Sequence, residues 1–367
     1  MTSVALVHDY LTQRGGAERV VLSMHRAFPD ATVHTSLYEP STCFPGYREV
    51  HVQPSPLNSV GLLRRRHRLA FPMLAPAFSS RVVDADVTIV SSSGWAHGVR
   101  TTGRKIVYCH APARWLHQRE QYLRQRGGAA RLALTSMQRP LRAWDLAAAR
   151  SADRYIANST VVRQRVWDAY GIDAEVIHPP HSIDVEGRQR PVPGVEPGYV
   201  LCIARLQAYK NVDTVVSAMR QLPGQRLVVV GTGRSLPYLE DIAGPNVRFV
   251  SEVSDSRLRW LYANAAVLAA ASHEDFGLTP VEAAAFGVPT VALRAGGYLD
   301  TVADHSTGLF FDELSADHLA VAIDKARSFG WDPSVVRAHA DRFSESSFVE
   351  ALRAVAGSDE DMTVGRA

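Results

Sequence analysis

The stretch EDFGLTPVE at residues 274–282 decides the fold of this chain. The apolar run AAVLAA at residues 265–270 precedes it and predicts a buried strand, and residues 281–286 follow it with a helical pattern. We expect Thr279 to be the N-cap of that helix and Pro280 to fall in its first turn. A strand, a glycine turn and a helix in this order form one unit of a doubly wound α/β domain.

The same segment brings a carboxylate and backbone amides to one point. Glu274 follows the strand, and the N–H groups of residues 277–279 lie at the helix start. Because the first N–H groups of a helix have no acceptor within it, this point suits a polyol or a phosphate. Glu282, eight residues after Glu274, has two interpretations. It either contacts a ligand or closes a capping box with Thr279.

Apolar runs alternate with helical patterns in both halves of the chain, which predicts two doubly wound α/β domains with parallel sheets. A stretch with five prolines, residues 179–197, indicates the linker between them. We therefore expect domains at 1–185 and 186–345, with a final helix near 346–356 that can pack back on the first. The predicted strands lie at 4–7, 87–90, 106–109, 155–157 and 174–177, then at 200–203, 226–230, 247–250, 267–270 and 290–292.

Composition indicates an ordinary globular protein, with 46% hydrophobic and 21% charged residues among 367. The three cysteines are too widely spaced to suggest a disulfide framework or a zinc site. We find no signal peptide and no apolar run near membrane-spanning length, and we expect a cytoplasmic protein. Residues 1–185 carry 23 Lys and Arg against 14 Asp and Glu, whereas residues 186–367 carry 17 against 23. The basic first half would suit an anionic acceptor, a membrane surface or nucleic acid.

Three other segments carry candidate ligand-binding groups. Arg205 and Lys210 follow the strand at 200–203 and could converge on a diphosphate, although such pairs are usually solvated surface cations. Gly15 and Gly16 open the first helix and allow close backbone approach, as an ordinary glycine turn also would. His110 stands at a strand end before a proline turn, where a histidine is either structural or part of a site.

These motifs together resemble the retaining GT-B glycosyltransferases of family 4. The resemblance rests on the pair Glu274 and Glu282, on the loop at residues 15–18, on the pair Arg205 and Lys210, and on the turn at residues 110–112. It covers nearly the whole chain in the family's order. It implies a GT-B fold, in which two Rossmann-like domains face a central cleft. The donor would lie mainly on residues 186–345 and the acceptor on residues 1–185. Ala204 stands where the family usually has glycine.

The resemblance also implies roles. Glu274 would bind hydroxyls of the donor sugar, Glu282 would hold the ribose, and His110 would steady the sugar near its anomeric carbon. Arg205 and Lys210 would neutralise the departing diphosphate. Further donor contacts are expected at Gly15, Gly16, Gly231, Phe276, Gly277, Leu278 and Thr279.

The resemblance implies retention by front-face attack, without an enzymic nucleophile, and we see no second carboxylate placed as one. We expect no metal and no cofactor besides the donor, because the basic pair already offsets the diphosphate charge. The Asp-x-Asp string at residues 84–86 precedes a strand, so we interpret it as a solvated turn at the opposite edge of the sheet. The Gly-Thr-Gly string at residues 231–233 lacks the third glycine and the acidic residue of a dinucleotide fingerprint.

The donor and the acceptor are less constrained. The strings at residues 208–210, 243–247 and 274–277 look most like bacterial mannosyltransferases that use GDP-mannose. The acceptor could be a glycan, a lipid-linked molecule or a small molecule. Two rival interpretations are another GT-B enzyme, such as a nucleotide-sugar epimerase or a phosphorylase, and a non-catalytic nucleotide-sugar-binding module.

Two basic regions suggest a peripheral contact with the inner face of the membrane. The run RRRHR at residues 64–68 lies among leucines and a phenylalanine, which suits anionic lipids. No nucleic-acid-binding motif accompanies the charge, so we do not expect nucleic acid as a partner. The second basic region contains Arg119, Arg124, Arg126, Arg131, Arg139 and Arg142.

Overall fold

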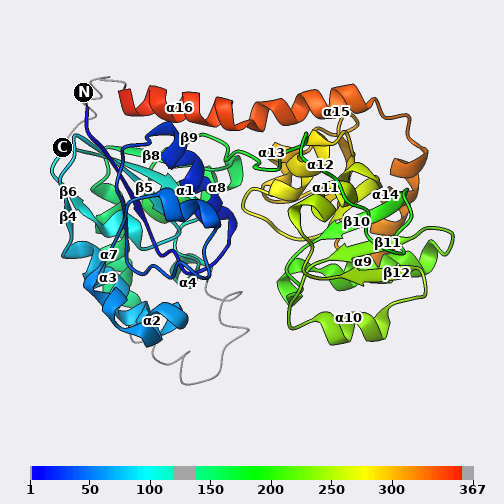
Figure 1. Cartoon of the computed structure of the whole chain (residues 1–367), viewed down its shortest axis with the longest axis horizontal. Coiled ribbons are helices and arrows are strands. Elements are labelled where there is room, and N and C mark those ends of the chain that lie inside the picture. Colours follow the sequence, from blue (N-terminus) through cyan, green and yellow to red (C-terminus); the bar gives the residue numbers. More distant parts are fainter. Residues whose placement is uncertain (1, 119–136, 358–367) are drawn as a thin grey trace. The chain divides into compact units, whose positions relative to one another are not determined.

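The computed structural model describes residues 2–118 and 137–357. The chain divides into two compact units (Figure 1). Unit 1 comprises Met1–Pro180 and the C-terminal segment from Glu345, and unit 2 comprises His181–Ser344. The first boundary falls at 180/181, whereas the proline-rich stretch placed it at 185/186. Of the second basic region, Arg119, Arg124, Arg126 and Arg131 lie outside the described residues.

Unit 1 contains a parallel sheet with the strand order β3-β2-β1-β5-β7-β8-β9. Its strands are β1 (Val4–His8), β2 (Val33–Thr35), β3 (Val52–Pro54), β5 (Val87–Ser92), β7 (Arg104–Cys109), β8 (Arg154–Ala157) and β9 (Glu175–Val176), and the short strands β4 (Val82–Val83) and β6 (Arg100–Thr101) pair separately. Its helices are α1 (Gly16–Ala27), α2 (Gly61–Arg65), α3 (Phe71–Ser79), α4 (Arg114–His117), α7 (Gln138–Arg150), α8 (Thr160–Tyr170) and α16 (Glu345–Gly357), with 3-10 turns η1 (Pro45–Glu49), η2 (Pro56–Ser59), η3 (His67–Ala70) and η4 (Ala96–Gly98).

Unit 2 contains a second parallel sheet, with the order β12-β11-β10-β13-β14-β15. Its strands are β10 (Tyr199–Ile203), β11 (Leu227–Val230), β12 (Val247–Val250), β13 (Ala265–Ala270), β14 (Thr290–Leu293) and β15 (Gly308–Phe311). Its helices are α9 (Val212–Ala218), α10 (Leu236–Ile242), α11 (Asp255–Ala263), α12 (Leu278–Ala285), α13 (Tyr298–Thr301), α14 (Ala316–Ser328) and α15 (Pro333–Ala340), with 3-10 turns η5 (Ala208–Lys210), η6 (Met219–Gln221) and η7 (Asp341–Phe343).

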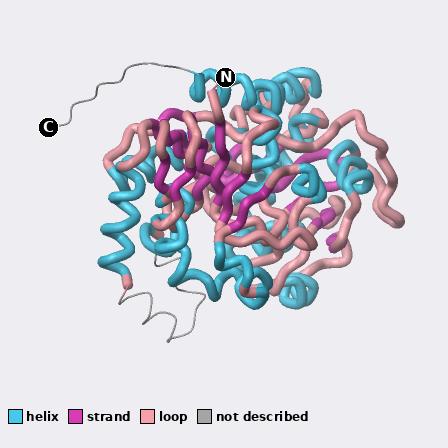
Figure 2. Tube along the Cα trace, turned by 60° about the vertical axis from the view of Figure 1, so that its left-hand side comes forward, coloured by secondary structure: helices cyan, strands magenta, loops and turns pink. Residues whose placement is uncertain are grey.

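Apolar side chains fill both faces of each sheet, as expected for parallel strands covered on two sides. In unit 1, Val90 and Val107 face one core, while Ile89 and Ile106 of the same strands face the other. Figures 1 and 2 show helices packed beside the strands in both units. The predicted class, two doubly wound α/β domains with parallel sheets, is confirmed. No helix among the described residues is both long and apolar enough to cross a membrane.

The C-terminal helix α16 packs against α1 in unit 1. Phe348 and Leu352 of α16 are buried in the core beneath α1. Ser23 Oγ donates a hydrogen bond of 2.7 Å to Glu345 Oε1, and Arg353 Nε donates one of 2.9 Å to the carbonyl oxygen of Ala27. The two ends of the described chain therefore stabilise the same unit.

Candidate active site

In unit 2, the loops that follow neighbouring strands meet at the carboxyl edge of the sheet. The loop after β10 and the loop after β11 pair backbone to backbone: Leu206 N–H donates to Thr232 O at 2.9 Å. A side chain on Gly231 would put its Cβ 1.9 Å from the Ala204 carbonyl oxygen, and one on Gly233 would lie 2.1 Å from that of Leu206. The Gly-Thr-Gly string is therefore required by close packing against the loop that carries the basic pair.

The carboxylate of Glu274 is held by Ser272 of its own loop and by Lys210 of the loop after β10. Ser272 Oγ donates to Glu274 Oε1 at 2.6 Å, and the ammonium of Lys210 donates to the same oxygen. Among the described residues, Glu274 Oε2 accepts no hydrogen bond. The fixed carboxylate thus keeps one oxygen available for a hydroxyl of a ligand.

Tyr298 joins this arrangement through Ser272. Its hydroxyl lies 2.9 Å from Ser272 Oγ. Burial, reinforced by the nearby Glu274 carboxylate, raises the pKa of Tyr298 well above its ordinary value, so its hydroxyl keeps its proton. Because the single proton of Ser272 goes to Glu274, Tyr298 must donate to Ser272. The result is a directed chain from Tyr298 through Ser272 to Glu274.

The two cations of the predicted pair are differently placed. Lys210 ends η5, and its side chain is mostly covered, with 16% exposed. Arg205 is exposed in the preceding loop. Asn211, with a positive φ of 52°, donates a 2.9 Å hydrogen bond from Nδ2 to the carbonyl oxygen of Ala271. This bond ties the loop that carries Lys210 to the loop that carries Glu274.

The start of α12 differs from the prediction. The N-cap is Gly277, with φ 91°, rather than Thr279, so the predicted N-cap was wrong. A side chain on Gly277 would approach the Tyr298 ring to 2.7 Å, and its positive φ favours glycine, which explains the early start. The amides of Leu278 and Thr279 now open the helix, consistent with a ligand-binding N-terminus.

Glu282 lies within α12, where Thr279 is no longer the cap. Its Oε2 accepts a 2.6 Å hydrogen bond from the hydroxyl of Tyr262 on α11. The capping box with Thr279 therefore does not form, because that motif requires Thr279 at the N-cap. The side chain of Phe276 is buried and packs on Phe343, with ring centroids 5.7 Å apart. Any ligand contact of Phe276 thus involves its backbone.

In unit 1, His110 follows β7 and is 9% exposed. Its Nε2 lies 2.8 Å from Ser91 Oγ on the neighbouring strand β5. Gly15 is the N-cap of α1, and a side chain there would come 2.3 Å from Glu18 Oε2. Glu18 is buried and accepts a 2.8 Å hydrogen bond from Gln13. Gly15 therefore makes room for a buried carboxylate, whereas Gly16 is exposed at the helix start.

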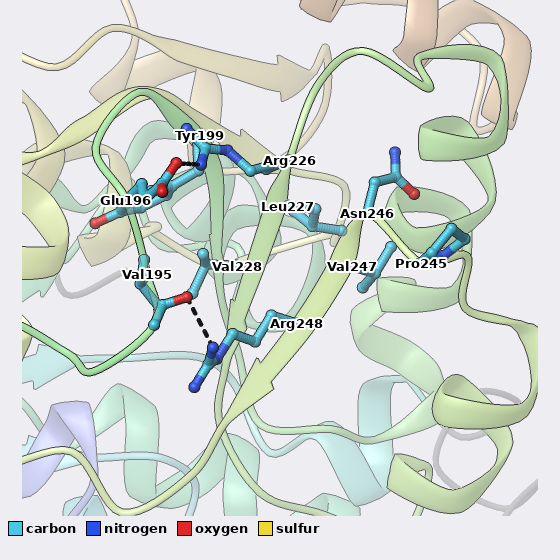
Figure 3. Close-up of a pocket in the computed structure, with 11 residues that line it drawn as sticks. Val195, Glu196, Tyr199, Arg226, Leu227, Val228, Pro245, Asn246, Val247 and Arg248 are labelled. Carbon is cyan, nitrogen blue, oxygen red and sulfur yellow. Dashed lines mark hydrogen bonds and ion pairs between the residues drawn. The ribbon is translucent and has the colours of Figure 1, made fainter.

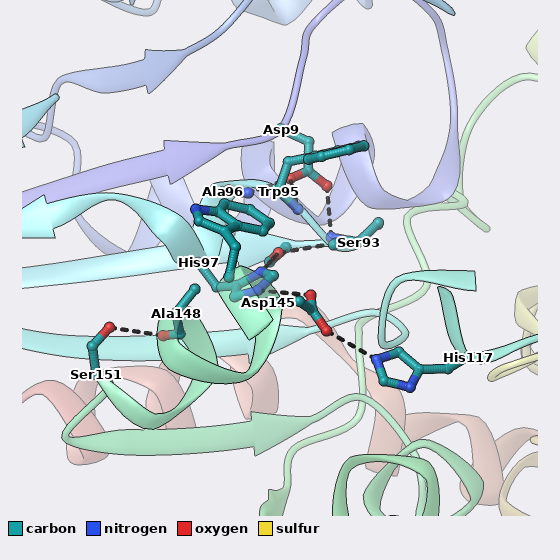
Figure 4. Close-up of polar contacts among 12 residues, drawn as sticks. Asp9, Ser93, Trp95, Ala96, His97, His117, Asp145, Ala148 and Ser151 are labelled. Carbon is teal, nitrogen blue, oxygen red and sulfur yellow. Dashed lines mark hydrogen bonds and ion pairs between the residues drawn. The ribbon is translucent and has the colours of Figure 1, made fainter. Parts of the chain in front are cut away.

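Two aspartates of unit 1, Asp9 and Asp145, hold neighbouring segments in place (Figure 4). Asp9 accepts backbone hydrogen bonds from Ser93 and Ala96, each at 2.6 Å, which fixes the loop after β5. Asp145, fully buried on α7, lies 3.1 Å from His97 Nε2 and 2.9 Å from His117 Nε2. Burial acts to raise the pKa of Asp145, but the hydrogen bond with His117 and the close contact with His97 outweigh burial, so the pKa of Asp145 is lowered.

The predicted solvated turn at residues 84–86 lies at the opposite edge of the unit 1 sheet, directly before β5. Asp86 accepts hydrogen bonds from the backbone N–H and the hydroxyl of Ser3, at 2.7 and 2.8 Å. The backbone hydrogen bond, followed by the hydroxyl, lowers the pKa of Asp86. Asp84 accepts from Thr102 at 2.7 Å. Within the described ranges, no group of three or more His, Cys, Asp or Glu could hold a metal.

A pocket in unit 2 lies away from the predicted site (Figure 3). It opens at the amino ends of β10, β11 and β12, where Arg226 pairs with Glu196. Arg248 donates to the carbonyl oxygens of Gly194 and Pro193, each at 2.8 Å. The arginines that line this pocket are thus engaged with other groups of the protein. Ligands of doubly wound sheets bind at the other edge, and we do not assign this pocket a role.

Matches to known proteins identify the family. The model described as "Glycosyltransferase Family 4" matches residues 14–185, and the one described as "Glycosyl transferases group 1" matches residues 186–329. The chain belongs to the family 4 glycosyltransferases of the GT-B fold. The predicted membership of family 4, with its GT-B fold, is thereby confirmed.

Curated relatives match part of the chain. It is 31% identical over 225 residues to a D-inositol 3-phosphate glycosyltransferase of Mycobacteroides abscessus, covering 55% of this chain and 51% of the relative. It is 32% identical over 196 residues to a GDP-mannose-dependent alpha-(1-6)-phosphatidylinositol monomannoside mannosyltransferase of Mycobacterium tuberculosis, covering 45% and 50%. The aligned region thus spans about half the length of these relatives.

Solved structures match nearly the whole chain. Anabaena HepE, in complex with UDP and glucose, matches with a TM-score of 0.70 and 19% identity, covering 98% of this chain and 100% of HepE. Sucrose-phosphate synthase from Thermosynechococcus elongatus matches with a TM-score of 0.69 and 18% identity, covering 96% and 98%. At this identity the likeness establishes the fold alone, and the GT-B prediction is confirmed.

Sequence reasoning missed the residues that support the predicted ones. Ser272, Tyr298 and Tyr262 hold the two glutamates, and Ser91 contacts His110. Ser272 stands two residues before Glu274, and Tyr298 follows a glycine pair, but neither position has a distinctive pattern. Only the folded loops bring their hydroxyls to the carboxylates.

Proposed function

We propose that this protein is a retaining glycosyltransferase that transfers a sugar from a nucleotide-diphosphate sugar to a glycan, lipid-linked or small-molecule acceptor. The observation that carries the proposal is the Glu274 carboxylate, which Ser272 and Lys210 hold at the carboxyl edge of the unit 2 sheet. Ser272 and Lys210 hold one carboxylate oxygen of Glu274, and the other carboxylate oxygen is available to a sugar hydroxyl. The donor site then combines a hydroxyl acceptor, a cation and a helix N-terminus.

Lys210 and Arg205 would stabilise charge that develops on the leaving diphosphate. In the proposed step, the acceptor oxygen bonds to the anomeric carbon from the face that the phosphate leaves. The bond from that carbon to the phosphate oxygen breaks, and the acceptor's proton passes to the phosphate. No enzymic nucleophile takes part, and no metal is required because the cations are supplied by side chains. His110 would lie against the sugar, and Glu282 would hold the ribose.

We propose GDP-mannose as the donor. The mannosyltransferase relative and the three strings noted in the sequence support this choice. Release of nucleotide from a panel of GDP-mannose, UDP-glucose and UDP-N-acetylglucosamine, with and without a lipid acceptor, tests it. Preference for a UDP-sugar would contradict the donor assignment while leaving the reaction class intact.

The same assay separates the rival functions. An epimerase would convert the donor sugar without an acceptor, and a phosphorylase would form a sugar phosphate from inorganic phosphate. A binding module would retain the nucleotide sugar unchanged. Glu274→Gln is the variant to compare with the wild type in this assay, since it keeps the shape of the side chain but removes the carboxylate charge. NMR of the first product tests retention, and an inverted anomeric configuration would contradict the mechanism.

We further propose a peripheral contact between unit 1 and an anionic lipid surface. Exposed arginines Arg65 and Arg66 lie beside exposed apolar side chains in the segment from residue 60 to residue 73. Arg64 is less available, because it pairs with Glu39 at 3.4 Å and donates to the carbonyl oxygen of Asn58. The exposed apolar side chains are Val60, Leu62, Leu69 and Met73.

A further inference from the structure

Three buried polar side chains form a line across the carboxyl edge of the unit 1 sheet. His8 is the last residue of β1, Ser91 lies near the end of β5, and His110 directly follows β7. The three strands are neighbours, and His8 and Ser91 are direct partners in the β1–β5 register. The side chains are 2%, 1% and 9% exposed. Water therefore has little access to the hydrogen bonds that join them.

The distances make this line a continuous relay. His8 Nδ1 lies 2.9 Å from Ser91 Oγ, and Ser91 Oγ lies 2.8 Å from His110 Nε2. His8 Nδ1 also lies 3.2 Å from the carbonyl oxygen of Ser91, a group that can only accept. The proton of His8 is therefore on Nδ1, from which it serves the oxygens of Ser91.

The position of the His8 proton determines which way Ser91 donates and which nitrogen of His110 carries a proton. A serine hydroxyl has a single proton. Ser91 Oγ accepts from His8, and among the described residues its proton has no acceptor other than His110 Nε2, so Ser91 donates to that nitrogen, which must then be unprotonated. We propose that His8 and Ser91 are positioning residues that fix His110 as the neutral Nδ1–H tautomer and hold its ring at the end of β7. The functional consequence rests on the proposed role of His110 beside the donor sugar.

The packing around the relay explains why the hydroxyl matters. The ring of Tyr108 lies edge-on to His110, with centroids 5.3 Å apart, and its own hydroxyl donates to the carbonyl oxygen of Ile177 at 2.9 Å. Tyr108 therefore limits the ring's position without selecting its tautomer. A tautomer is selected only by a hydrogen-bond partner on a ring nitrogen, and Ser91 is such a partner for Nε2 of His110. A histidine with the other tautomer would present a different polar group to the same ligand.

The tautomer can be measured independently of activity. In protein labelled with nitrogen-15 at histidine, protonated and unprotonated ring nitrogens give well-separated NMR signals, and His110→Gln assigns those of His110. We expect the wild type to show only the Nδ1–H tautomer. Ser91→Ala should lose this selectivity, and Ser91→Thr, which keeps the hydroxyl, should restore it. An Nε2–H tautomer in the wild type, or an unchanged pattern in Ser91→Ala, would overturn the proposal.

Ser92→Ala provides the matched control. Ser92 is the next residue of β5 and equally buried, but its hydroxyl contacts His97 Nδ1 at 3.0 Å instead of His110. With the donor as substrate, Ser91→Ala should lower kcat by roughly tenfold to a hundredfold with little change in KM, as misplacement of a catalytic group does. Ser92→Ala should keep kcat. Equal kcat losses in the two variants would show that Ser91 has only a packing role.

The two readouts separate this proposal from the proposed function. Wild-type turnover by His110→Gln would remove His110 from the transfer reaction. The NMR result would still decide whether His8 and Ser91 fix its tautomer. Conversely, a lost tautomer with normal turnover in Ser91→Ala would overturn the positioning role and leave glycosyl transfer intact.

Discussion

The Lys210 ammonium donates a hydrogen bond to the Glu274 carboxylate, although the two residues lie 64 positions apart in the chain. The sequence assigned them to different parts of the donor, the diphosphate and the sugar. Their contact is consistent with these two proposed roles, because a sugar and its diphosphate are adjacent in a nucleotide sugar. The contact also offsets both charges, so a bound diphosphate would compete with Glu274 for Lys210.

Lys210→Ala should slow transfer strongly. Loss of an oriented charge at a leaving group costs about 10²–10³ in kcat. The variant also leaves Glu274 without its cation, so binding of the donor sugar should weaken. Steady-state kinetics with a saturating acceptor measure both effects. Lys325→Ala, an exposed lysine on α14, is the control and should behave as the wild type. Near-normal kcat in Lys210→Ala would remove the diphosphate assignment.

Local patterns predicted the strands that carry the site, because parallel strands buried on both faces are continuous apolar runs. β10 and β13 lie within a residue or two of their predicted bounds. The strands β2 and β3 were not predicted, since three residues give no measurable periodicity. The N-cap of α12 was misplaced because Thr279 has the right chemistry, whereas the tight approach of Tyr298 to Gly277 depends on a residue far along the chain. No local sequence pattern predicts that the hydroxyls of Ser272 and Tyr262 contact the two glutamates.

Glu282→Gln should weaken nucleotide binding with little change in stability. If Glu282 accepts the ribose hydroxyls, loss of its charge removes a charge-assisted hydrogen bond, worth about 1.5–3 kcal/mol. Tyr262→Phe is the matched variant, because it removes only the 2.6 Å hydrogen bond from the protein side. Calorimetric titration with GDP and UDP compares them. The same affinity in Glu282→Gln and wild type would leave Glu282 a structural partner of Tyr262.

Transfer should continue in excess EDTA. In the proposed reaction, Lys210 and Arg205 supply the charge that a metal provides in other enzymes. Asp84 and Asp86 are engaged with Thr102 and Ser3 at the far edge of the sheet. Rates before and after chelation, then after added Mn²⁺ or Mg²⁺, test this. A complete loss on chelation that manganese reverses would contradict metal independence.

Asp145→Asn should destabilise unit 1, because it breaks a buried contact with His97 and His117, at a cost of about 3 kcal/mol. The pKa of Asp145 is lowered in the folded protein, so its stabilisation is present above the unfolded pKa of about 3.9 and is lost as pH falls through the folded pKa. Guanidinium unfolding at neutral pH and at pH ~3, below the unfolded pKa, should show a smaller acid-dependent loss in the variant. An equal loss in both proteins would mean that Asp145 does not control the acid sensitivity.

Removal of Arg65 and Arg66 should weaken binding to anionic vesicles. Each arginine near an anionic bilayer contributes about 1 kcal/mol, and the neighbouring exposed side chains of Leu62 and Leu69 add apolar area. The double variant Arg65→Ser with Arg66→Ser should therefore bind roughly thirtyfold more weakly in co-sedimentation, and added salt should weaken the wild type as it screens the surface.

The control for this prediction is Arg188→Ser with Arg190→Ser, which removes the same charge from exposed positions in unit 2. If binding depends on the segment at residues 60–73, this control should sediment as the wild type does. A loss of the same size in both variants would indicate attraction by net charge alone. Recovery of the wild type in the supernatant with anionic and neutral vesicles alike would contradict the membrane contact and favour a soluble acceptor.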